Sequence, residues 1–412
     1  MNENSKKIIT IIIVILFIGI FIYFIFFNKE NNNNSSQNNV VSFPTDKVID
    51  VNLGEDFNSL RNDPNYLNDS DVQAQIPILR KISDNPVSGA IIFRNNIKKD
   101  DFYTIRYMEK ITGHIYETKT NSLTSERISN KTIPKINTTE WLNKDTLFFN
   151  YLDDDLIKTY SATLTSNATS TEMNLEGAYL QNDIQNIIYL DNDLFYLKDF
   201  GSDSKIILTD IQNTTPRELF TSPLQEWLID NIDDVRVSFT TKTTENTLGY
   251  LFIYNSITER FSKILDKKLN LSTLLNKNLD VLYSHNIKSG PTLSLYNFEK
   301  EVSTNISITT FPEKCVWSKN NIDLYCSVPY QQLSNDSLEN WYKGNILFSD
   351  DIWNINTDTD KIKNIIPLID LEGEGIDATK LSLADNNDYL VFINKKDYSL
   401  WGLQIISNEI SI

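Results

Sequence analysis

The feature that most constrains this sequence is a type of segment that recurs about every 45 residues. Each copy is a short run rich in Tyr, Phe, Ile, Leu and Thr, bounded by Asn, Asp, Ser or Thr, a pattern typical of a β-strand. Successive copies are 44, 48, 46, 42, 57 and 48 residues apart when each is aligned on one anchor residue. The anchors are Tyr116, Tyr160, Leu208, Tyr254, Tyr296, Trp353 and Trp401.

Such a period predicts an all-β fold of the β-propeller class over residues 77–412. A repeat of 40–50 residues that holds about four short strands is typical of one propeller blade. The two faces of a blade are buried only by its neighbours, so the blades are stable once they stack into a closed ring. We predict seven blades, with six or eight as alternatives. An irregular array of β-sandwiches would not require so even a period.

The ends of the repeat region predict how the ring closes. The last unit offers three strand-like segments, at 378–384, 388–394 and 400–406. Upstream of the first unit, "PILRKIS" (77–83) resembles the segments that would form outer strands, such as "SERIS" (125–129). We therefore predict that residues 77–83 supply the missing outer strand of the last blade.

Both cysteines of the chain lie in one short stretch, "KCVWSKNNIDLYCSVP" (314–329). If this stretch forms a hairpin that turns at residues 320–321, Cys315 lies directly opposite Cys326, at a separation that suits a disulfide. We predict this disulfide, with two free thiols as the alternative. Two cysteines and two histidines make a poor set of zinc ligands. Because disulfides persist outside the cytoplasm, the pair favours an extracellular location.

The N-terminal segments predict a single membrane anchor. Residues 8–27 form twenty uncharged, apolar positions, enough for one transmembrane helix. Residues 1–7 carry two lysines and are expected to form a short cytoplasmic tail, which places the C-terminal domain outside the cytoplasm. Residues 28–76 are expected to be a polar tether and lead-in. We further expect the loop-rich face of the propeller to point away from the membrane.

The charge of the chain excludes some classes of partner. The formal net charge is −17 at neutral pH. Nucleic acids and anionic lipid surfaces are bound by basic patches, so we predict no nucleic-acid partner. We find no G-x-S-x-G, phosphate-binding G-x-x-x-x-G-K, H-E-x-x-H or C-x-x-C motif, and we predict no catalytic residue, cofactor or metal site. Several acidic turns lack the spacing of an EF-hand calcium loop.

Several segments resemble a known group of propellers. The similarity covers roughly residues 77–406 and is carried by "RYMEKITGHIYE" (106–117), "ISNKTIPKI" (128–136), the cysteine hairpin, "NWYKG" (340–344) and "DDIWNIN" (350–356). These segments resemble uncharacterised, single-anchor β-propeller proteins of small-genomed candidate-phylum bacteria. More loosely, the repeats are similar to WD40-like and TolB-like propellers. The resemblance implies the fold and its topology and brings no established activity.

One long connection is the candidate binding site. The 57-residue step arises from "YQQLSNDSLENWYKGNILFS" (330–349), which is too long for a hairpin turn and contains several aromatic residues. We predict that Trp341, Tyr342 and Lys343 contact a protein or glycan partner on the membrane-distal face. The alternative is that the aromatic residues fold back and cap the blade.

The function predicted from the sequence is that of a membrane-anchored extracellular module that binds or scaffolds a protein or a glycan. Two alternatives stay open. The first is an envelope hydrolase of the glycosidase kind, with carboxylates in the central channel. The second is a purely structural envelope domain. Two convergent carboxylates in a deep channel would favour the hydrolase, and a channel filled by apolar side chains would exclude it.

Overall fold

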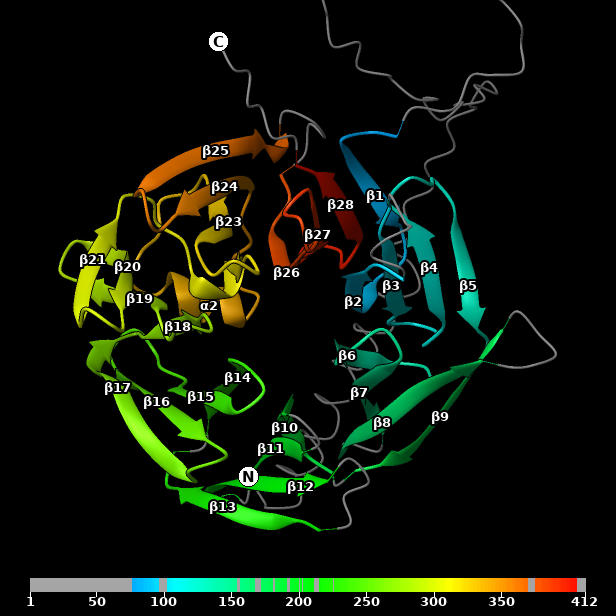
Figure 1. Cartoon of the computed structure of the whole chain (residues 1–412), viewed down its shortest axis with the longest axis horizontal. Helices are drawn as coiled ribbons and strands as arrows, with labels where there is room; N and C mark the ends of the chain where they lie inside the picture. Colours follow the sequence, from blue (N-terminus) through cyan, green and yellow to red (C-terminus); the bar gives the residue numbers. More distant parts are fainter. Residues whose placement is uncertain are drawn as a thin grey trace, which may run out of the picture. The chain divides into compact units, whose positions relative to one another are not determined.

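Seven four-stranded antiparallel sheets form the described part of the protein (Figure 1). The structure is a computed structural model that describes residues 76–405 apart from short segments. Those segments are 96–101, 154–155, 167–171, 181, 191–192, 200, 202, 211–214, 225 and 370–374. The chain divides into two units, 1–73 and 74–412, and only the second contains described residues.

The sheets follow one another along the chain as blades, each running from an inner to an outer strand (Figure 1). Blades 1 to 3 comprise β2 (Val87–Phe93), β3 (Thr104–Glu109), β4 (Ile115–Lys119) and β5 (Ser125–Ser129); β6 (Ile136–Trp141), β7 (Thr146–Asp153), β8 (Leu156–Ser166) and β9 (Met173–Tyr179); and β10 (Ile184–Leu190), β11 (Asp193–Asp199), β12 (Ser204–Asp210) and β13 (Arg217–Ser222).

Blades 4 to 7 repeat the same arrangement, and the last of them takes its outer strand from the start of the domain. They comprise β14 (Trp227–Asn231), β15 (Arg236–Thr241), β16 (Leu248–Asn255) and β17 (Arg260–Leu269); β18 (Ser272–Leu275), β19 (Val281–Ile287), β20 (Gly290–Asn297) and β21 (Val302–Ile306); β22 (Cys315–Trp317), β23 (Asp323–Pro329), β24 (Asp350–Asn356) and β25 (Lys361–Pro367); and β26 (Ala378–Leu383), β27 (Tyr389–Asn394), β28 (Leu400–Gln404) and β1 (Leu79–Ser83).

The predicted seven-bladed propeller is confirmed, and the sequence period has a direct structural meaning. All seven anchor residues of the repeat lie on the third strand of their blade, from Tyr116 on β4 to Trp401 on β28. The six-blade and eight-blade alternatives and the β-sandwich array are therefore excluded. The long step in the period comes from the connection between β23 and β24, which contains the helix α2 (Ser337–Tyr342).

The ring closes through β1, as the sequence predicts. β1 pairs antiparallel with β28, with Leu79 opposite Leu403 and Lys81 opposite Trp401. Arg80 is buried and donates to the hydroxyl of Tyr389 at 3.2 Å and to the carbonyl oxygen of Lys119 at 2.8 Å. Because Lys119 belongs to blade 1, Arg80 joins the closing strand to both blades at the seam.

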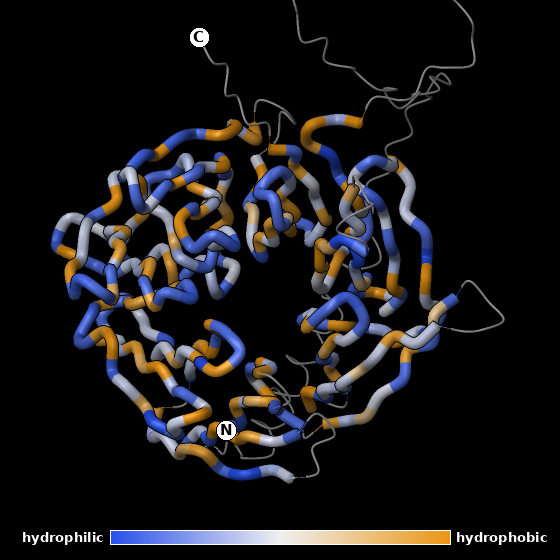
Figure 2. Tube along the Cα trace, in the orientation of Figure 1, coloured by the Kyte–Doolittle hydropathy of each residue, from blue (hydrophilic) through white to orange (hydrophobic). Residues whose placement is uncertain are grey.

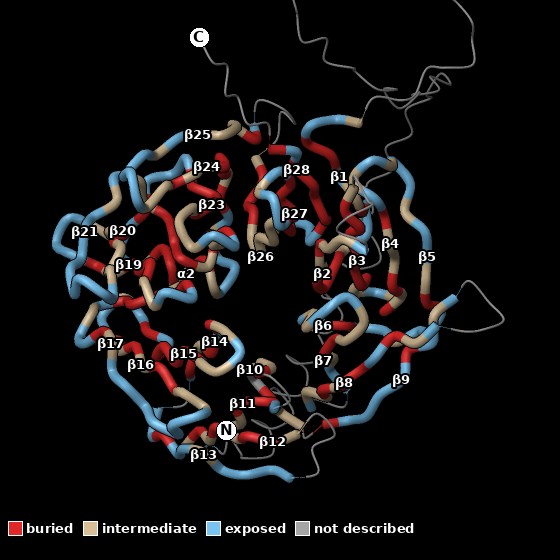
Figure 3. Tube along the Cα trace, in the orientation of Figure 1, coloured by how far each residue is buried: buried red, intermediate tan, exposed pale blue. Residues whose placement is uncertain are grey.

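The hydrophobic core consists of separate clusters, one at each of the seven contacts between neighbouring blades. Between blades 7 and 1, for example, Val391 and Leu400 pack with Val87 and Ile105. Figure 2 shows apolar residues distributed around the whole ring, and Figure 3 shows burial in the inner and middle strands and exposure along outer strands such as β13. The apolar area that stabilises the fold is thus buried between blades.

The predicted disulfide is confirmed. Cys315 on β22 lies directly opposite Cys326 on β23, and the two form a disulfide across the hairpin. The predicted neighbours also pair, with Trp317 opposite Leu324. Both cysteines are buried in the cluster between blades 5 and 6.

The two faces of the ring differ in the connections that they carry. Because consecutive strands alternate in direction, the connections between blades and those from second to third strands emerge on one face, which we call the loop-rich face. The turns from first to second and from third to fourth strands emerge on the opposite face. The helix α2 lies on the loop-rich face.

The predicted tail (1–7), the predicted transmembrane helix (8–27) and the predicted tether and lead-in (28–76), apart from residue 76, lie outside the described residues. Within the parts of 76–405 that the structure describes, no helix combines the length and the hydropathy that crossing a bilayer requires.

Candidate functional site

Trp341, a residue of the predicted binding site, is buried beneath the loop-rich face. Its side chain is 4% exposed and packs against Phe311 and Phe348 in a small apolar cluster. As a correction to the sequence-based expectation, Trp341 presents no surface to a partner. The alternative, in which the 330–349 segment folds back onto its blade, is confirmed for this residue. The cause is a set of buried charges beneath the indole ring.

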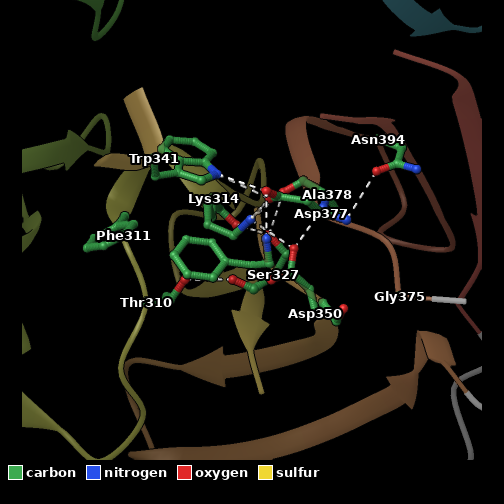
Figure 4. Close-up of polar contacts among 12 residues, drawn as sticks. Thr310, Phe311, Lys314, Ser327, Trp341, Asp350, Gly375, Asp377, Ala378 and Asn394 are labelled. Atoms are coloured by element: carbon green, nitrogen blue, oxygen red, sulfur yellow. Dashed lines mark hydrogen bonds and ion pairs between the residues drawn. The ribbon is translucent and has the colours of Figure 1, made fainter. Parts of the chain in front are cut away.

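A fully buried lysine and two fully buried aspartates hold the 330–349 segment in place (Figure 4). The Lys314 ammonium lies 2.8 Å from a carboxylate oxygen of Asp350 and 2.6 Å from one of Asp377. Asp377 also accepts hydrogen bonds from the indole N–H of Trp341 at 3.0 Å and from the backbone N–H of Phe348 at 3.0 Å. This network therefore joins blades 6 and 7 and fixes the segment at both ends of the apolar cluster.

Burial shifts the pKa values of two groups in this network. Burial raises the pKa of Asp350 to about 6, and the facing ammonium of Lys314 opposes the shift. Burial lowers the pKa of Lys395 to about 8, while the carboxylate of Asp377 opposes that shift. The Lys395 ammonium lies 3.7 Å from the centre of the Trp341 ring, at the distance of a cation–π contact. The charged groups of this network pair with one another and hold the loop in place, although one carboxylate oxygen of Asp350 has no hydrogen-bond partner among the described residues.

Tyr342 and Lys343, the other two predicted binding residues, point to different surroundings. The Tyr342 hydroxyl donates a hydrogen bond to Glu313, which precedes β22, and the Tyr342 side chain is half-buried. Lys343 is exposed at the end of α2 and pairs with Glu339 on the same helix. The three residues do not converge on one site. A direct contact of Lys343 with a partner stays a prediction.

A polar cavity lies where the inner strands of blades 2, 3, 4 and 7 approach the centre of the ring. We call it the inner cavity; its volume is about 340 Å³. The charged residues that line it are Glu140 on β6, Asp230 on β14 and Lys380 on β26. Its other lining residues are Asn137, Thr138, Phe148, Phe149, Asn150, Thr159, Ile184, Asn186, Ile187, Ile188 and Ile229.

Of the two carboxylates of the inner cavity, Glu140 has an ion-pair partner and Asp230 has none among the described residues. The Lys380 ammonium lies 3.1 Å from a carboxylate oxygen of Glu140. Within the described part of the chain, the Asp230 carboxylate has no ion-pair partner. Asp230 is exposed in the cavity, yet desolvation by the surrounding protein, together with the charges of Glu313 and Glu140, raises its pKa to about 6. An open carboxylate at this position favours a cation.

A second, mainly apolar cavity opens on the loop-rich face above blades 7, 1 and 2. We call it the outer cavity; its volume is about 640 Å³. Ile111, Leu152 and Tyr398 line it and are 62%, 54% and 45% exposed. Each of these residues stands in, or directly beside, a connection between second and third strands of its blade. The rest of the lining is Pro86, Lys110, Lys135, Ile136, Asn137, Asn150, Tyr151 and Ile157.

A β-bulge brings the two cavities together. The pairing of β6 with β7 shifts between Ile136 and Thr138, which leaves Asn137 as the extra residue. The side-chain oxygen of Asn150 accepts hydrogen bonds from the backbone N–H and the hydroxyl of Thr138, both at 3.1 Å, and so closes the bulge. Asn137 and Asn150 line both cavities. The cavities are therefore adjacent, and we refer to them together as the groove.

Sequence reasoning missed the groove because its residues come from distant parts of the chain. Glu140 and Asp230 are separated by two blades in sequence. A signal was nevertheless present, since the first strand of each blade lines the centre of a propeller and the charged residues on those strands can be read from the repeat. Among the residues that the structure describes, no three His, Cys, Asp or Glu side chains are grouped so as to hold a metal ion. The absence of a metal site stays a prediction.

Comparisons with known proteins relate the chain to others by fold alone. No protein-family model matches the sequence, and no curated protein matches it. Among solved structures, it is similar to an oligogalacturonate lyase from Vibrio parahaemolyticus, with a TM-score of 0.50 and 10% identity over 82% of this chain and 95% of that one. At this identity the likeness shows a shared propeller fold.

Two further propellers are also similar. TolB from Acinetobacter baumannii has a TM-score of 0.42 and 10% identity over 76% of this chain and 78% of that one. The β-propeller domain of the Trilobed protease from Pyrococcus furiosus has a TM-score of 0.47 and 10% identity over 78% of this chain and 99% of that one.

Proposed function

We propose that this protein is a binding module that takes a segment of a partner protein into the groove, whose outer cavity opens on the loop-rich face. The single observation that carries the proposal is the groove itself, an exposed apolar cavity that adjoins a polar one at the centre of a rigid ring. Cavities that combine an apolar wall with a few polar groups are the usual form of a binding site. The buried network around Trp341 supports a structural role for this residue of the predicted aromatic site instead.

The composition of the outer cavity favours a protein partner over a glycan. Four of its apolar side chains are the branched aliphatic residues Ile111, Ile136, Leu152 and Ile157. Aliphatic surface is complementary to the apolar side chains of a peptide, whereas a sugar offers mainly hydroxyl groups that need hydrogen-bond partners. Tyr398 and Tyr151 add aromatic area that suits either ligand.

The location of the module is part of the same proposal. The apolar segment 8–27 would anchor the protein in the cell membrane in a single pass, with the propeller outside the cytoplasm and the loop-rich face turned away from the bilayer. The confirmed disulfide supports an oxidising compartment. The proposed kinship with single-anchor propellers of candidate-phylum bacteria supports the same arrangement.

A matched pair of variants tests the proposal on the full-length chain. Ile111→Asp places a charge in the outer cavity, and Ile257→Asp places the same charge in a turn on the opposite face, where Ile257 is 75% exposed. Both variants and the wild type are applied to an array of peptides and an array of glycans. We expect binding to peptides that Ile111→Asp weakens at least tenfold and Ile257→Asp leaves unchanged. Binding to glycans alone, or equal effects of both variants, would contradict the proposal.

Hydrolysis is a second candidate function, and one observation favours it. Asp230, with its raised pKa, and Glu140, paired with Lys380, line the same cavity. Two carboxylates in unlike surroundings are the arrangement by which many glycosidases divide acid and base roles. The aliphatic outer cavity makes this the weaker candidate. Release of a chromophore from aryl glycosides by the wild type, and not by Glu140→Gln, would favour the hydrolase over the binding module.

A further inference from the structure

The charges of the inner cavity suit one kind of side chain in the partner segment. This inference rests on the proposed function. We infer that the inner cavity binds the cationic side chain of a lysine or arginine in the partner segment, with Asp230 as its ion-pair partner. The apolar residues of the same segment would lie in the outer cavity.

The charges that line the inner cavity are complementary to such a side chain. Two carboxylates, Glu140 and Asp230, face a single lysine, Lys380. Lys380 reaches across from β26 to pair with Glu140, so an ammonium group is already accommodated at one of the two carboxylates. Asp230 is the remaining acceptor. One further cation would give each of the two carboxylates in the cavity a positively charged partner.

A neutral group in the cavity wall also lacks a partner. Thr159 is 2% exposed and lines the inner cavity, and its hydroxyl has no hydrogen-bond partner within the described residues. Buried hydroxyl groups in folded proteins are nearly always paired, so an unpaired one marks a place where a ligand atom or a water is expected. This observation is independent of the carboxylates and points to the same cavity.

The size and the walls of the cavity fit one long side chain. Its volume of about 340 Å³ corresponds to roughly eleven waters at about 30 Å³ each. That is room for a lysine or arginine side chain with some water and far too little for a folded element. Ile187, Ile188 and Ile229 line the cavity beside Asp230, so the methylene stem has apolar surface to cover while its charged end reaches the carboxylate.

Binding of a cation at Asp230 has a measurable consequence for pH. The charged groups around Asp230 are Glu140, Glu313 and Lys380, and the Tyr342 hydroxyl lies near Glu313. With a pKa of about 6 in the empty protein, Asp230 is ionised to about one-tenth at pH 5 and about nine-tenths at pH 7. Because a cation pairs with the ionised form, affinity for a cationic segment should rise about tenfold between these two pH values.

The test uses the full-length chain and a position-scanning library of acetylated, amidated hexapeptides. Lys, Arg, Gln or Glu is fixed at each position in turn, and binding is measured at pH 5 and pH 7. Asp230→Asn removes the proposed partner, and Asp358→Asn, in an exposed turn on the opposite face, makes the same change of charge as a control. Melting temperatures are recorded for both variants to show that they fold.

For the wild type and Asp358→Asn, we expect pools with Lys or Arg to bind at least tenfold more tightly than Gln or Glu pools at pH 7, and this preference to shrink at pH 5. For Asp230→Asn, we expect the preference and its pH dependence to disappear while binding of the Gln pools is retained. Equal binding of Lys and Gln pools by the wild type would overturn the inference and leave the proposed function standing. No binding of any pool, or binding of glycans instead, would overturn both.

Discussion

At the scale of single residues, the structure separates charges that stabilise the fold from charges that are open to a ligand. Lys314 forms ion pairs with two aspartates, and all three residues are buried, although one carboxylate oxygen of Asp350 has no hydrogen-bond partner within the described part of the chain. Asp230, by contrast, faces the inner cavity and has no ion-pair partner among the residues that the structure describes. The sequence alone does not separate these cases, because burial is set by which blades meet. Trp341 shows the same difficulty: a Trp in a long polar loop is equally compatible with exposure and with capping, and the buried Asp377 beneath it decides the outcome.

The first prediction concerns Lys314. Replacing it in Lys314→Ala leaves Asp350 and Asp377 buried without their cation, which should lower the free energy of unfolding by about 3–5 kcal/mol. Lys319→Ala, which removes an exposed pair with Asp385, should lower it by at most about 1 kcal/mol. Denaturant titration at pH 7 measures both. Because the pKa of Asp350 is already raised to about 6, the loss in Lys314→Ala should be smaller at pH 5. Equal losses in the two variants would refute this account of the network.

The second prediction concerns Asp230 and stability. The pKa of Asp230 in the folded protein, about 6, is above the ordinary value of 3.8, so the folded state binds this proton more tightly than the unfolded state does. Ionised Asp230 therefore disfavours folding above pH 6, and this penalty vanishes below about pH 4. Asp230→Asn should raise the free energy of unfolding at pH 7 by on the order of 1 kcal/mol, a value reduced for solvent contact in the cavity.

Thermal melts of Asp230→Asn and the wild type between pH 4 and pH 8 check this expectation. The gain in melting temperature should be largest above pH 6 and absent near pH 4. Residues that serve binding often reduce the stability of the folded protein. A variant that is less stable than the wild type at pH 7 would mean that the Asp230 carboxylate supports the fold.

At the scale of elements, the hairpin of β22 and β23 shows how far strand register can be predicted. The hairpin turn and the pairing of Cys315 with Cys326 follow from the sequence because strand residues pair in a fixed order around a short turn. The bulge at Asn137 does not follow from it, because the shift depends on a hydrogen bond from Thr138 to Asn150 on the next strand. The register of the β22–β23 hairpin is fixed locally by its short turn, whereas the register of β6 against β7 is set by a side-chain contact between the two strands.

The third prediction concerns the disulfide. β22 has only three residues, so few ladder hydrogen bonds hold this inner strand and the cross-link carries much of its stability. Replacing both cysteines in Cys315→Ala/Cys326→Ala should lower the free energy of unfolding by about 3 kcal/mol, as the closure of a short loop predicts. Denaturant titration measures the loss, and the wild type under reducing conditions should show a similar one. If reduction leaves the unfolding midpoint unchanged, the disulfide does not stabilise the fold.

At the scale of the whole molecule, the sequence predicts the architecture and not the groove. The blade period and the closing strand are repeated or local signals, so the seven-bladed ring and its seam at β1 can be read from the chain. The groove depends on side chains from blades 1, 2, 3, 4 and 7 that meet only after the ring has closed. Closure is therefore the step on which any function of the groove depends.

The fourth prediction concerns the seam. A chain that begins at residue 84 lacks β1, which exposes the edge of β28 and removes the hydrogen bonds of Arg80. It should melt at a lower temperature than a chain that begins at residue 76, and it should aggregate, because an uncovered strand edge pairs with other chains. Calorimetry and light scattering compare the two. Indistinguishable melting of the two chains would show that β1 does not close the ring.

Hydrogen exchange of the full-length chain, with and without a lysine-containing hexapeptide from the best-binding pool, tests the central claim most directly. If the groove takes a segment of a partner, the peptide should slow exchange in β6, in β14 and in the connections that contain Ile111 and Leu152. Exchange in the turn of Ile257 on the opposite face should not change. Slowed exchange confined to that face or to the outer strands would contradict the claim that this propeller binds its partner through the groove.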